Sequence, residues 1–496
     1  MANSNWFILG LELFSSLFLI AIGLVFLLLT YMYIADRWQT KQAVRHNYPI
    51  VGRFRYFFEK QGEFFRQYFF AMDREELPFN RSERSWVYRA AKNVDRTIAF
   101  GSTRPLDANG SIIFLNTAFP TVNEESVPPS TITIGADCPQ PYSTDRICHI
   151  SAMSFGALSR PAITALSHGA AMAGCWLNTG EGGLSPYHLK GNCDLVFQIG
   201  TAKYGVRNSK GHLDHAKLKQ LAAYSQVKMF EIKMSQGAKP GKGGILPGIK
   251  VTEEIAHIRG IPVGEDSISP NGHTEFQNVS DIVDMINTVR KVTGKPVGIK
   301  FVLGEQQWLQ SLFAEINHRG EASAPDFVTI DGAEGGTGAA PQPLMDYVGL
   351  PLKESLPIVV AMLKQNGLKH RIKVIASGKL ITPSRIAWAL ALGADFIASA
   401  RGNMFALGCI QALQCNKDTC PTGITTHNKR LQQGLDPRDK SVRVANYHHA
   451  LHHDLGMLAH TCGIHDPREL SPRHIRIVTE TGFTQALDDS YRHLER

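Results

Sequence analysis

Short apolar runs that end in glycine-rich or polar clusters recur through the middle of the chain. Their Val, Ile and Phe content is typical of buried strands. The sequence contains eight such segments, over residues 147–154, 175–180, 195–200, 230–237, 297–302, 327–332, 374–378 and 396–402. Helical patterns lie between many of them, for example over 160–174, 279–294 and 382–394. Eight alternating strand and helix units predict an α/β fold, the (β/α)8 TIM barrel, whose active site forms at the C-terminal ends of the strands.

A different pattern opens the chain. Residues 13–35 form a run of 23 residues without a charged side chain, and about 20 apolar residues span a bilayer as a helix. A secretory signal is the alternative, but no Lys or Arg precedes the run, and the run is too long for the apolar core of a signal. Basic residues follow it, so the positive-inside rule predicts a single-pass inner-membrane protein with its N-terminus outside and its catalytic domain in the cytoplasm.

These patterns divide the chain into four expected regions. They are a transmembrane anchor over 1–36, a membrane-proximal helical and irregular lead-in over 37–110, the barrel over 111–426, and a C-terminal helical extension over 427–496. Residues 48–72 mix aromatic and basic side chains. This segment is expected either to lie along the membrane surface or to pack its aromatic face on the barrel. Residues 111–116 and 130–135 read as short strands.

Composition sets broad limits on function. The 496 residues suffice for one large catalytic domain with an appendage. The net charge of +8 is modest and the chain has no Lys/Arg block with interleaved aromatic residues, so nucleic acid is not an expected partner.

Three of the eight cysteines lie close together in the sequence. Cys409, Cys415 and Cys420 follow the spacing C-x5-C-x4-C, and Pro421 closes the group. A disulfide would leave one thiol over, and zinc usually takes four ligands with a closely spaced Cys pair that is missing here. An iron–sulfur cluster is held by cysteine thiolates. Three buried structural cysteines are the remaining alternative.

The cysteine spacing and four further motifs resemble those of the FMN-dependent glutamate synthases, in the order of that family. The motifs are SAMSFGALS (151–159), NTGEGG (178–183), KMSQGAKPGKGGILPGIKV (233–251), DGAEGGTGAAP (331–341) and GCIQALQCNKDTCPTGITT (408–426). The resemblance covers about residues 110–470 and corresponds to the synthase portion of the large subunit. It implies an FMN-binding barrel and a 3Fe-4S cluster on Cys409, Cys415 and Cys420. Nothing in the chain resembles the family's glutaminase domain or its C-terminal β-helix.

The resemblance also implies an FMN site at the barrel mouth. Lys300 would face the flavin ring, where its charge stabilises the reduced flavin. A structural salt bridge is the alternative for this lysine. The other expected FMN contacts are Ser151, Met153, Thr179 and Gln198 along the ring, Gly335, Gly336 and Gly338 in a glycine-rich loop, and Gly378 and Gly402 at the phosphate.

A second group of residues is expected to bind the substrate. Lys233, Gln236 and Lys239 place two cations and an amide near one strand end, which suits a dicarboxylate such as 2-oxoglutarate. Glu181 is the expected acid, or the group that binds incoming ammonia. Two positions depart from the family pattern: Leu184 stands where the family usually has a second acid, and Ser377 stands where it tends to have Asp.

The resemblance therefore implies reductive amination of 2-oxoglutarate to glutamate. Ammonia would come from solution or from a separate glutaminase subunit, and electrons from a ferredoxin or a partner reductase, since no G-x-G-x-x-G motif after a strand marks a nicotinamide site. Two alternatives stay open. One is an FMN and iron–sulfur oxidoreductase or amino-acid synthase that uses another 2-oxo acid or amine. The other is a non-enzymatic redox relay tethered to the membrane.

Overall fold

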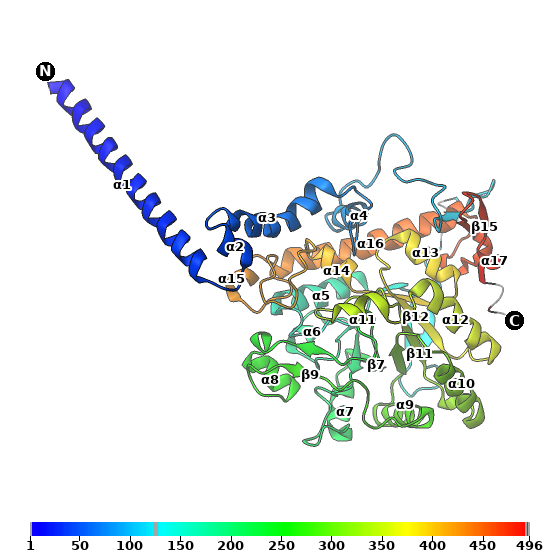
Figure 1. The fold of residues 1–496 in the computed structure, drawn as a ribbon. Helices are drawn as coiled ribbons and strands as arrows, with labels where there is room; N and C mark the ends of the chain where they lie inside the picture. Colours follow the sequence, from blue (N-terminus) through cyan, green and yellow to red (C-terminus); the bar gives the residue numbers. More distant parts are fainter. Residues whose placement is uncertain (1, 123–126, 492–493, 495–496) are drawn as a thin grey trace. The chain divides into compact units, whose positions relative to one another are not determined.

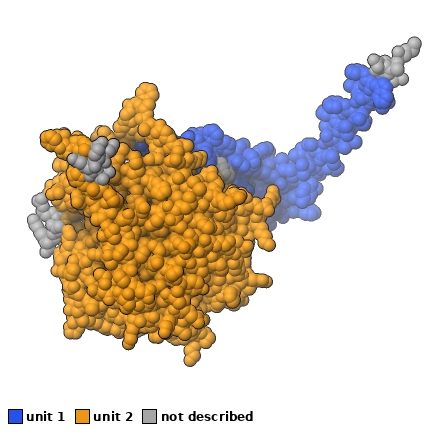
Figure 2. Space-filling model, turned by 180° about the vertical axis from the view of Figure 1, so that it is seen from behind, with its two compact units in different colours: residues 1–82 blue, residues 83–496 orange. Residues whose placement is uncertain are grey.

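The structure, a computed structural model, describes residues 2–122, 127–491 and 494 (Figure 1). It forms two compact units, residues 1–82 and residues 83–496, which Figure 2 shows in different colours. The strands predicted to form the barrel lie entirely within the second unit.

The first unit is helical. It contains α1 (Ala2–Trp38), α2 (Ala43–Asn47), α3 (Gly52–Phe65) and the π-helical turn η1 (Arg66–Phe70). Among the described residues one stretch, Trp6–Trp38 of α1, is long and apolar enough to cross a membrane, and none of its apolar core is buried. The chain then enters α4 (Arg81–Ala91), most of which belongs to the second unit.

The centre of the second unit is a closed barrel of parallel strands. Its strands are β4 (Cys148–Ile150), β5 (Leu177–Asn178), β6 (Leu195–Ile199), β7 (Val227–Lys233), β10 (Val297–Phe301), β11 (Phe327–Asp331), β12 (Lys373–Ser377) and β13 (Phe396–Ser399). They follow chain order around the barrel, and β13 pairs with β4 to close it. Each strand overlaps one of the eight apolar runs, although β7 begins three residues and β12 one residue before its run. The predicted (β/α)8 barrel is therefore confirmed.

Helices surround the barrel (Figure 1). The main ones are α5 (Arg160–Ala173), α7 (His215–Ala222), α9 (Val279–Thr293), α10 (Gln307–Arg319), α12 (Leu352–Gln365), α13 (Pro383–Ala391) and α14 (Arg401–Ala406). Shorter elements in the loops are α6 (Pro186–Leu189), β8 (Ile245–Leu246), η3 (Gly248–Lys250), α8 (Glu253–Arg259), β9 (Ser267–Ile268), η4 (Glu321–Ser323) and α11 (Gln342–Tyr347).

Local sequence signals explain where these helices begin and end. The Ser159 side chain accepts a hydrogen bond from the Ala162 amide at the start of α5, which satisfies one of the free N–H groups there. Asn278 and Asp281 form a reciprocal capping box at the start of α9. Both helices end at a glycine with positive φ, which a side chain with a Cβ would disfavour.

The N-terminal end of the barrel is filled by apolar side chains. Phe327 and Phe396, the first residues of β11 and β13, pack there with Trp176 and with Ile134 and Tyr142. The last two belong to β2 (Ile132–Ile134) and β3 (Tyr142–Thr144), an antiparallel pair that precedes the barrel. With this end filled, the opposite end, where the strands finish, is the open one.

The C-terminal region, predicted as a helical extension, also contains strands. The C-terminal region contains α15 (Lys429–Gln432), α16 (Pro437–Thr461), η5 (Pro467–Glu469), η6 (Pro472–His474) and α17 (Leu487–Tyr491). It also contains β14 (Ile475–Val478) and β15 (Thr484–Ala486). These strands form a sheet with β1 (Ile112–Phe114), which precedes the barrel strands in the sequence. Because α16 packs along α5 and α13, the C-terminal region forms part of the layer of helices around the barrel.

Candidate active site

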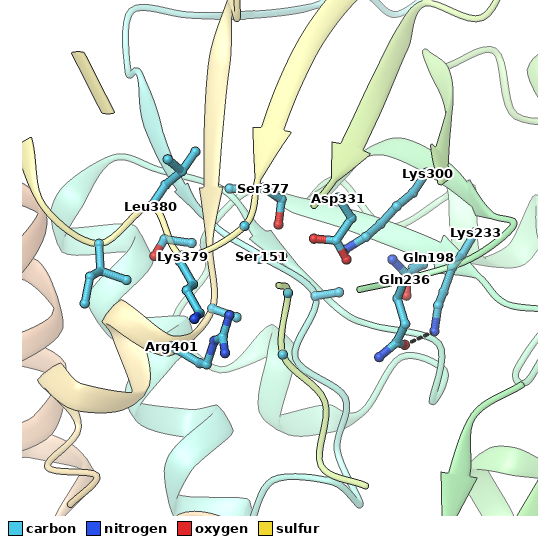
Figure 3. A pocket seen from close by; sticks show the side chains of 18 residues that line it. Ser151, Gln198, Lys233, Gln236, Lys300, Asp331, Ser377, Lys379, Leu380 and Arg401 are labelled. Carbon is cyan, nitrogen blue, oxygen red and sulfur yellow. Dashed lines mark hydrogen bonds and ion pairs between the residues drawn. The ribbon is translucent and has the colours of Figure 1, made fainter. Parts of the chain in front are cut away.

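A cavity with about 530 Å3 of empty space opens at the C-terminal ends of the barrel strands. Eight of the predicted site residues line the cavity: Ser151, Gln198, Lys233, Gln236, Lys300, Gly335, Gly336 and Gly378. Figure 3 shows their side chains with two cations, Lys379 and Arg401, at one end of the cavity, and Lys233 and Gln236 at the other.

The two cations at the first end lie close enough to affect each other. Burial lowers the pKa of Lys379, and the neighbouring Arg401 lowers it further. Burial also lowers the pKa of Arg401 to about 10. Arg401 donates a hydrogen bond to the Glu334 carbonyl at 2.7 Å, and a Cβ on Gly336 would lie only 2.9 Å from its Nε atom. Two partly buried cations beside a glycine-rich backbone form a site that suits a phosphate group.

A buried carboxylate organises the floor of the cavity. The Glu231 carboxylate accepts hydrogen bonds from Asn178 at 2.8 Å, Gln198 at 2.6 Å and Thr329 at 2.6 Å. It sits near Lys300, whose ammonium lies 3.4 Å from Asp331. Burial alone would lower the pKa of Lys300, but Asp331 and Glu231 hold it above its ordinary value. Lys300 is therefore a fixed positive charge at the bottom of the site.

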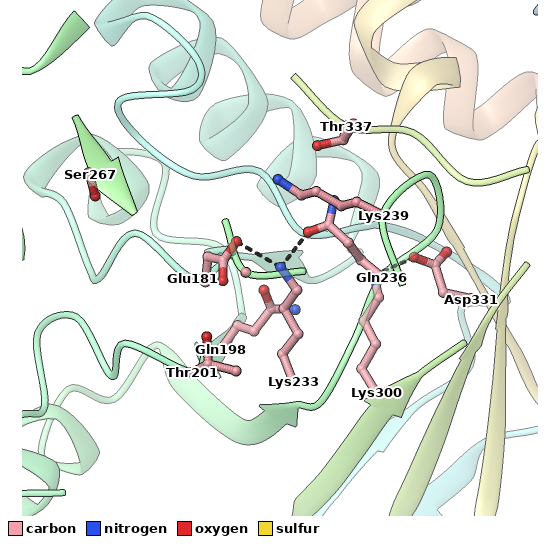
Figure 4. A network of polar contacts seen from close by, with 12 residues as sticks. Glu181, Gln198, Thr201, Lys233, Gln236, Lys239, Ser267, Lys300, Asp331 and Thr337 are labelled. Carbon is pink, nitrogen blue, oxygen red and sulfur yellow. Dashed lines mark hydrogen bonds and ion pairs between the residues drawn. The ribbon is translucent and has the colours of Figure 1, made fainter. Parts of the chain in front are cut away.

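The other end of the cavity contains a lysine between two oxygen acceptors (Figure 4). The Lys233 ammonium lies 2.7 Å from the Glu181 carboxylate and also donates a hydrogen bond to the Gln236 side-chain oxygen. Burial alone would raise the pKa of Glu181, but Lys233 brings it below its ordinary value. Glu181 is thus an anion at neutral pH.

Lys239 adds a second cation above this group. Burial and the charge of Lys233 lower its pKa to about 8. Its ammonium donates a hydrogen bond of 3.3 Å to the Ala339 carbonyl. Two glycines make room for the carboxylate below it, since a Cβ on Gly200 or Gly244 would lie 2.7 or 2.4 Å from a Glu181 oxygen.

Four predicted FMN contacts do not line the cavity. Met153 and Thr179 are buried, and the Thr179 hydroxyl accepts a hydrogen bond from the backbone N–H of Gln198. Gly338 lies further along its loop, and Gly402 faces α16. A Cβ on Gly402 would lie 2.2 Å from the Tyr447 hydroxyl. Glycine is needed at position 402 for close packing of α16.

The three clustered cysteines lie on the loop after α14. All eight cysteines are free thiols, so no disulfide explains the spacing. The backbone N–H of Gln411 donates a hydrogen bond to the Cys409 sulfur at 3.4 Å, and the Thr422 hydroxyl contacts the Cys420 sulfur at 3.4 Å. The Lys250 ammonium donates to the Cys415 carbonyl at 3.3 Å. Burial raises the pKa of the Cys409 thiol to about 12 and also raises that of Cys415. Burial would raise the pKa of Cys420 too, but contacts with Thr422 and Thr425 bring it below its ordinary value.

Within the described ranges, no three His, Cys, Asp or Glu side chains converge on a single ion position. An iron–sulfur cluster does not require such convergence, because each thiolate binds a different iron atom at the cluster's edge.

Sequence reasoning missed three residues of the site. Asp331 is the last residue of β11, and Arg401 follows the end of β13 by two residues. A charged residue near the end of an apolar strand, as at Lys300, is the sequence signal that could have identified both. Glu231 lies within a strand of otherwise apolar character, and it becomes informative only once its neighbours on β6 and β11 are known.

Comparison with known proteins identifies a family. Residues 115–465 match the model described as the conserved region in glutamate synthase. The chain is 41% identical over 510 aligned residues to the glutamate synthase large subunit-like protein YerD of Bacillus subtilis, with 95% of this chain and 96% of that protein covered. It is 34% identical to the archaeal glutamate synthase [NADPH] of Methanocaldococcus jannaschii, covering 66% of this chain and 61% of that protein.

The archaeal-type glutamate synthase [NADPH] of Thermotoga maritima is also 34% identical, and the match covers 63% of this chain and 59% of that protein. The chain thus spans about three-fifths of these archaeal-type enzymes but nearly all of the Bacillus protein. Among solved structures, a flavocytochrome b2 mutant with benzoylformate gives a TM-score of 0.48 at 15% identity, covering 83% of each chain.

Proposed function

The chain belongs to the glutamate synthase family, and from that membership and the barrel-mouth geometry we propose that it reductively aminates 2-oxoglutarate to glutamate. The observation that carries the proposal is the arrangement of Lys233, Lys239 and Glu181. Lys233 lines one end of a cavity whose other end suits a phosphate, and it pairs with Glu181 while the charge of Lys239 lies close to both. This spacing of charges matches a cofactor phosphate at one end and a dicarboxylate with ammonia at the other.

FMN is the cofactor that the cavity supports. Lys379 and Arg401, with the backbone at Gly378 and Gly336, would hold its phosphate, while Ser151, Gln198 and Lys300 would contact its ring. Bound FMN would take up electrons and deliver a hydride to carbon 2 of the substrate imine. The fixed charge of Lys300 favours an electron-rich ring beside it.

The protein's own groups bind and orient the substrate. Lys233 would exchange its contact with Gln236 for a substrate carboxylate, and Lys239 would approach the second carboxylate. Ionised Glu181 would bind ammonium and accept a proton from it, so that the ammonia formed attacks the 2-oxo carbon and the adduct loses water to give the imine. The low pKa of Glu181 favours this role over that of an acid.

A 3Fe-4S cluster on Cys409, Cys415 and Cys420 would supply electrons from a ferredoxin or a partner reductase. The sulfur contacts on the cysteine loop support this assignment. Ammonia would come from solution or from a separate glutaminase subunit. The apolar stretch of α1 supports an anchor in the inner membrane, with the barrel on the cytoplasmic side.

One departure from the family pattern favours a second candidate substrate. Leu184 replaces a family acid near Glu181, which suits a different 2-oxo acid or amine. The test is a panel of 2-oxo acids assayed with ammonium, the detergent-purified protein and a reduced viologen without oxygen. The proposal expects the highest kcat/KM with 2-oxoglutarate; a higher value with a monocarboxylic 2-oxo acid would favour the alternative.

A further inference from the structure

The helix that follows the apolar segment carries an aromatic stripe. Positions spaced three and four residues apart share one face of a helix. Along α3 and η1 this face holds Phe54, Phe57, Phe58, Phe65, Tyr68 and Phe69. The exposed fractions of these six residues range from 45% to 74%. We call these six residues the aromatic stripe.

The rings of the aromatic stripe contact one another in two groups. The centroids of Phe57 and Phe58 lie 5.3 Å apart, and those of Phe65 and Phe69 lie 5.6 Å apart. The stripe therefore consists of two exposed aromatic clusters on one helix face. Exposed apolar surfaces of this kind mark interaction sites.

Basic side chains flank the aromatic stripe on both edges. With about 100° between successive residues of a helix, Arg55 and Arg66 follow one edge and Arg53 and Lys60 follow the other. Arg55, Lys60 and Arg66 are exposed. Long cationic side chains at the edges of an apolar face reach lipid phosphates while their stems cover apolar surface.

A buried carboxylate ties the start of α3 to the end of the apolar helix. Asp36 of α1 is 0% exposed. It lies 2.5 Å from Arg45 and 2.8 Å from Arg53 of α3, and it accepts a hydrogen bond from the Ile50 amide at 3.0 Å. Because Asp36 directly follows the 23-residue uncharged run, this junction fixes α3 at the level where the bilayer surface would lie.

We propose that α3 and η1 lie in the plane of the membrane, with the aromatic stripe inserted at the boundary of headgroups and acyl chains. The partner is an anionic lipid surface, because a segment long enough to span a bilayer ends next to the stripe and cations border both of its edges. This inference rests on the spanning role of α1 and is independent of the reaction catalysed.

Photo-crosslinking of the full chain in vesicles of phosphatidylcholine and phosphatidylglycerol tests this placement. Phe58→p-benzoylphenylalanine puts the probe on the aromatic stripe, and Glu59→p-benzoylphenylalanine puts it on the exposed opposite side. Leu24→p-benzoylphenylalanine in α1 reports on the spanning segment. We expect lipid adducts at positions 24 and 58, with about tenfold less at position 59.

The inference would be overturned if position 24 gave lipid adducts while position 58 gave no more than position 59. Crosslinks from position 58 to the barrel would also overturn it. A lack of adducts at position 24 would overturn the spanning role of α1 and this inference with it. Neither result bears on glutamate synthesis, which the purified protein reports separately.

The charges are tested by a triple variant, Arg55→Gln, Lys60→Gln and Arg66→Gln, with Glu59→Gln as the control. Basic residues strengthen binding to an anionic surface, so lipid adducts at position 58 should fall in anionic vesicles and stay unchanged in pure phosphatidylcholine. An unchanged circular dichroism spectrum would show that the variant folds. An unchanged adduct yield in anionic vesicles would contradict the phosphate contacts.

Discussion

Lys233 of β7 and Lys300 of β10 are direct register partners on adjacent strands, yet each ammonium has its own carboxylate. Lys233 lies 2.7 Å from Glu181, and Lys300 lies 3.4 Å from Asp331. Two cations side by side in a low-dielectric site repel each other unless both are paired. This separate pairing puts one ion pair at the proposed substrate end of the cavity and the other at the floor proposed for the cofactor.

Lys379→Ala should weaken FMN binding. Loss of a hydrogen bond to a charged group costs about 1.5–3 kcal/mol, which corresponds to a rise of about 10- to 150-fold in Kd. Fluorescence titration of the apoprotein with FMN measures this change. Lys373→Ala is the matched control, because Lys373 begins the same strand at the opposite end of the barrel. Equal FMN affinity in the two variants would remove Lys379 from the phosphate site.

Cys415→Ser should abolish the cluster, because a three-ligand cluster has no thiolate to spare. Flavin reduction by a one-electron donor protein should then fail, while reduction by dithionite, which reaches the flavin directly, should remain. Stopped-flow absorbance follows both reactions. Cys462→Ser, which removes a thiol outside the loop, should behave as the unmodified chain. Donor-driven reduction at the normal rate in Cys415→Ser would overturn the relay.

The affinity for 2-oxoglutarate should depend on pH through Lys239. Its pKa is lowered to about 8, so the ammonium is charged below pH 8 and loses its proton as the pH rises through that value. A dicarboxylate therefore binds more weakly above pH 8. Calorimetric titration with 2-oxoglutarate should show Kd rising from pH 7 to pH 9. Lys239→Arg keeps its charge and should flatten the profile; an identical profile would assign the titration to another group.

The intact chain should remain in the membrane fraction after a carbonate wash, which strips peripheral proteins. Deletion of residues 2–35, which keeps Asp36 for Arg45 and Arg53, should release the protein into the wash. Immunoblots of both fractions measure the distribution. Recovery of the full-length chain in the wash would contradict a spanning α1.

The barrel was predictable because each strand carries its own apolar run and ends in a polar or glycine-rich cluster. Lys300 and Lys233 stood out for the same reason, as charges at the ends of apolar strands. Arg401 was missed because an arginine after an apolar run is equally typical of an exposed loop. Only the closed barrel brings it beside Lys379 from the neighbouring strand.

Other features depend on contacts between segments far apart in the sequence. Glu231 gains its role from Asn178 and Thr329 on other strands. The sequence predicts a phosphate contact at Gly402, whereas in the structure the Tyr447 side chain of α16 excludes a Cβ at this position. The β1, β14 and β15 sheet joins chain segments more than 300 residues apart, which no local pattern reveals.

The most direct measurement is the formation of 15N-glutamate from 15N-ammonium and 2-oxoglutarate with reduced viologen, comparing the unmodified chain with Lys233→Ala. Lys228→Ala is the matched control, since Lys228 pairs with Asp194 near the other end of β7. The proposed function predicts labelled glutamate from the unmodified chain and from Lys228→Ala, and a loss in kcat/KM of about 10- to 150-fold in Lys233→Ala with flavin retained. No labelled glutamate from the unmodified chain, or equal turnover in Lys233→Ala, would contradict it.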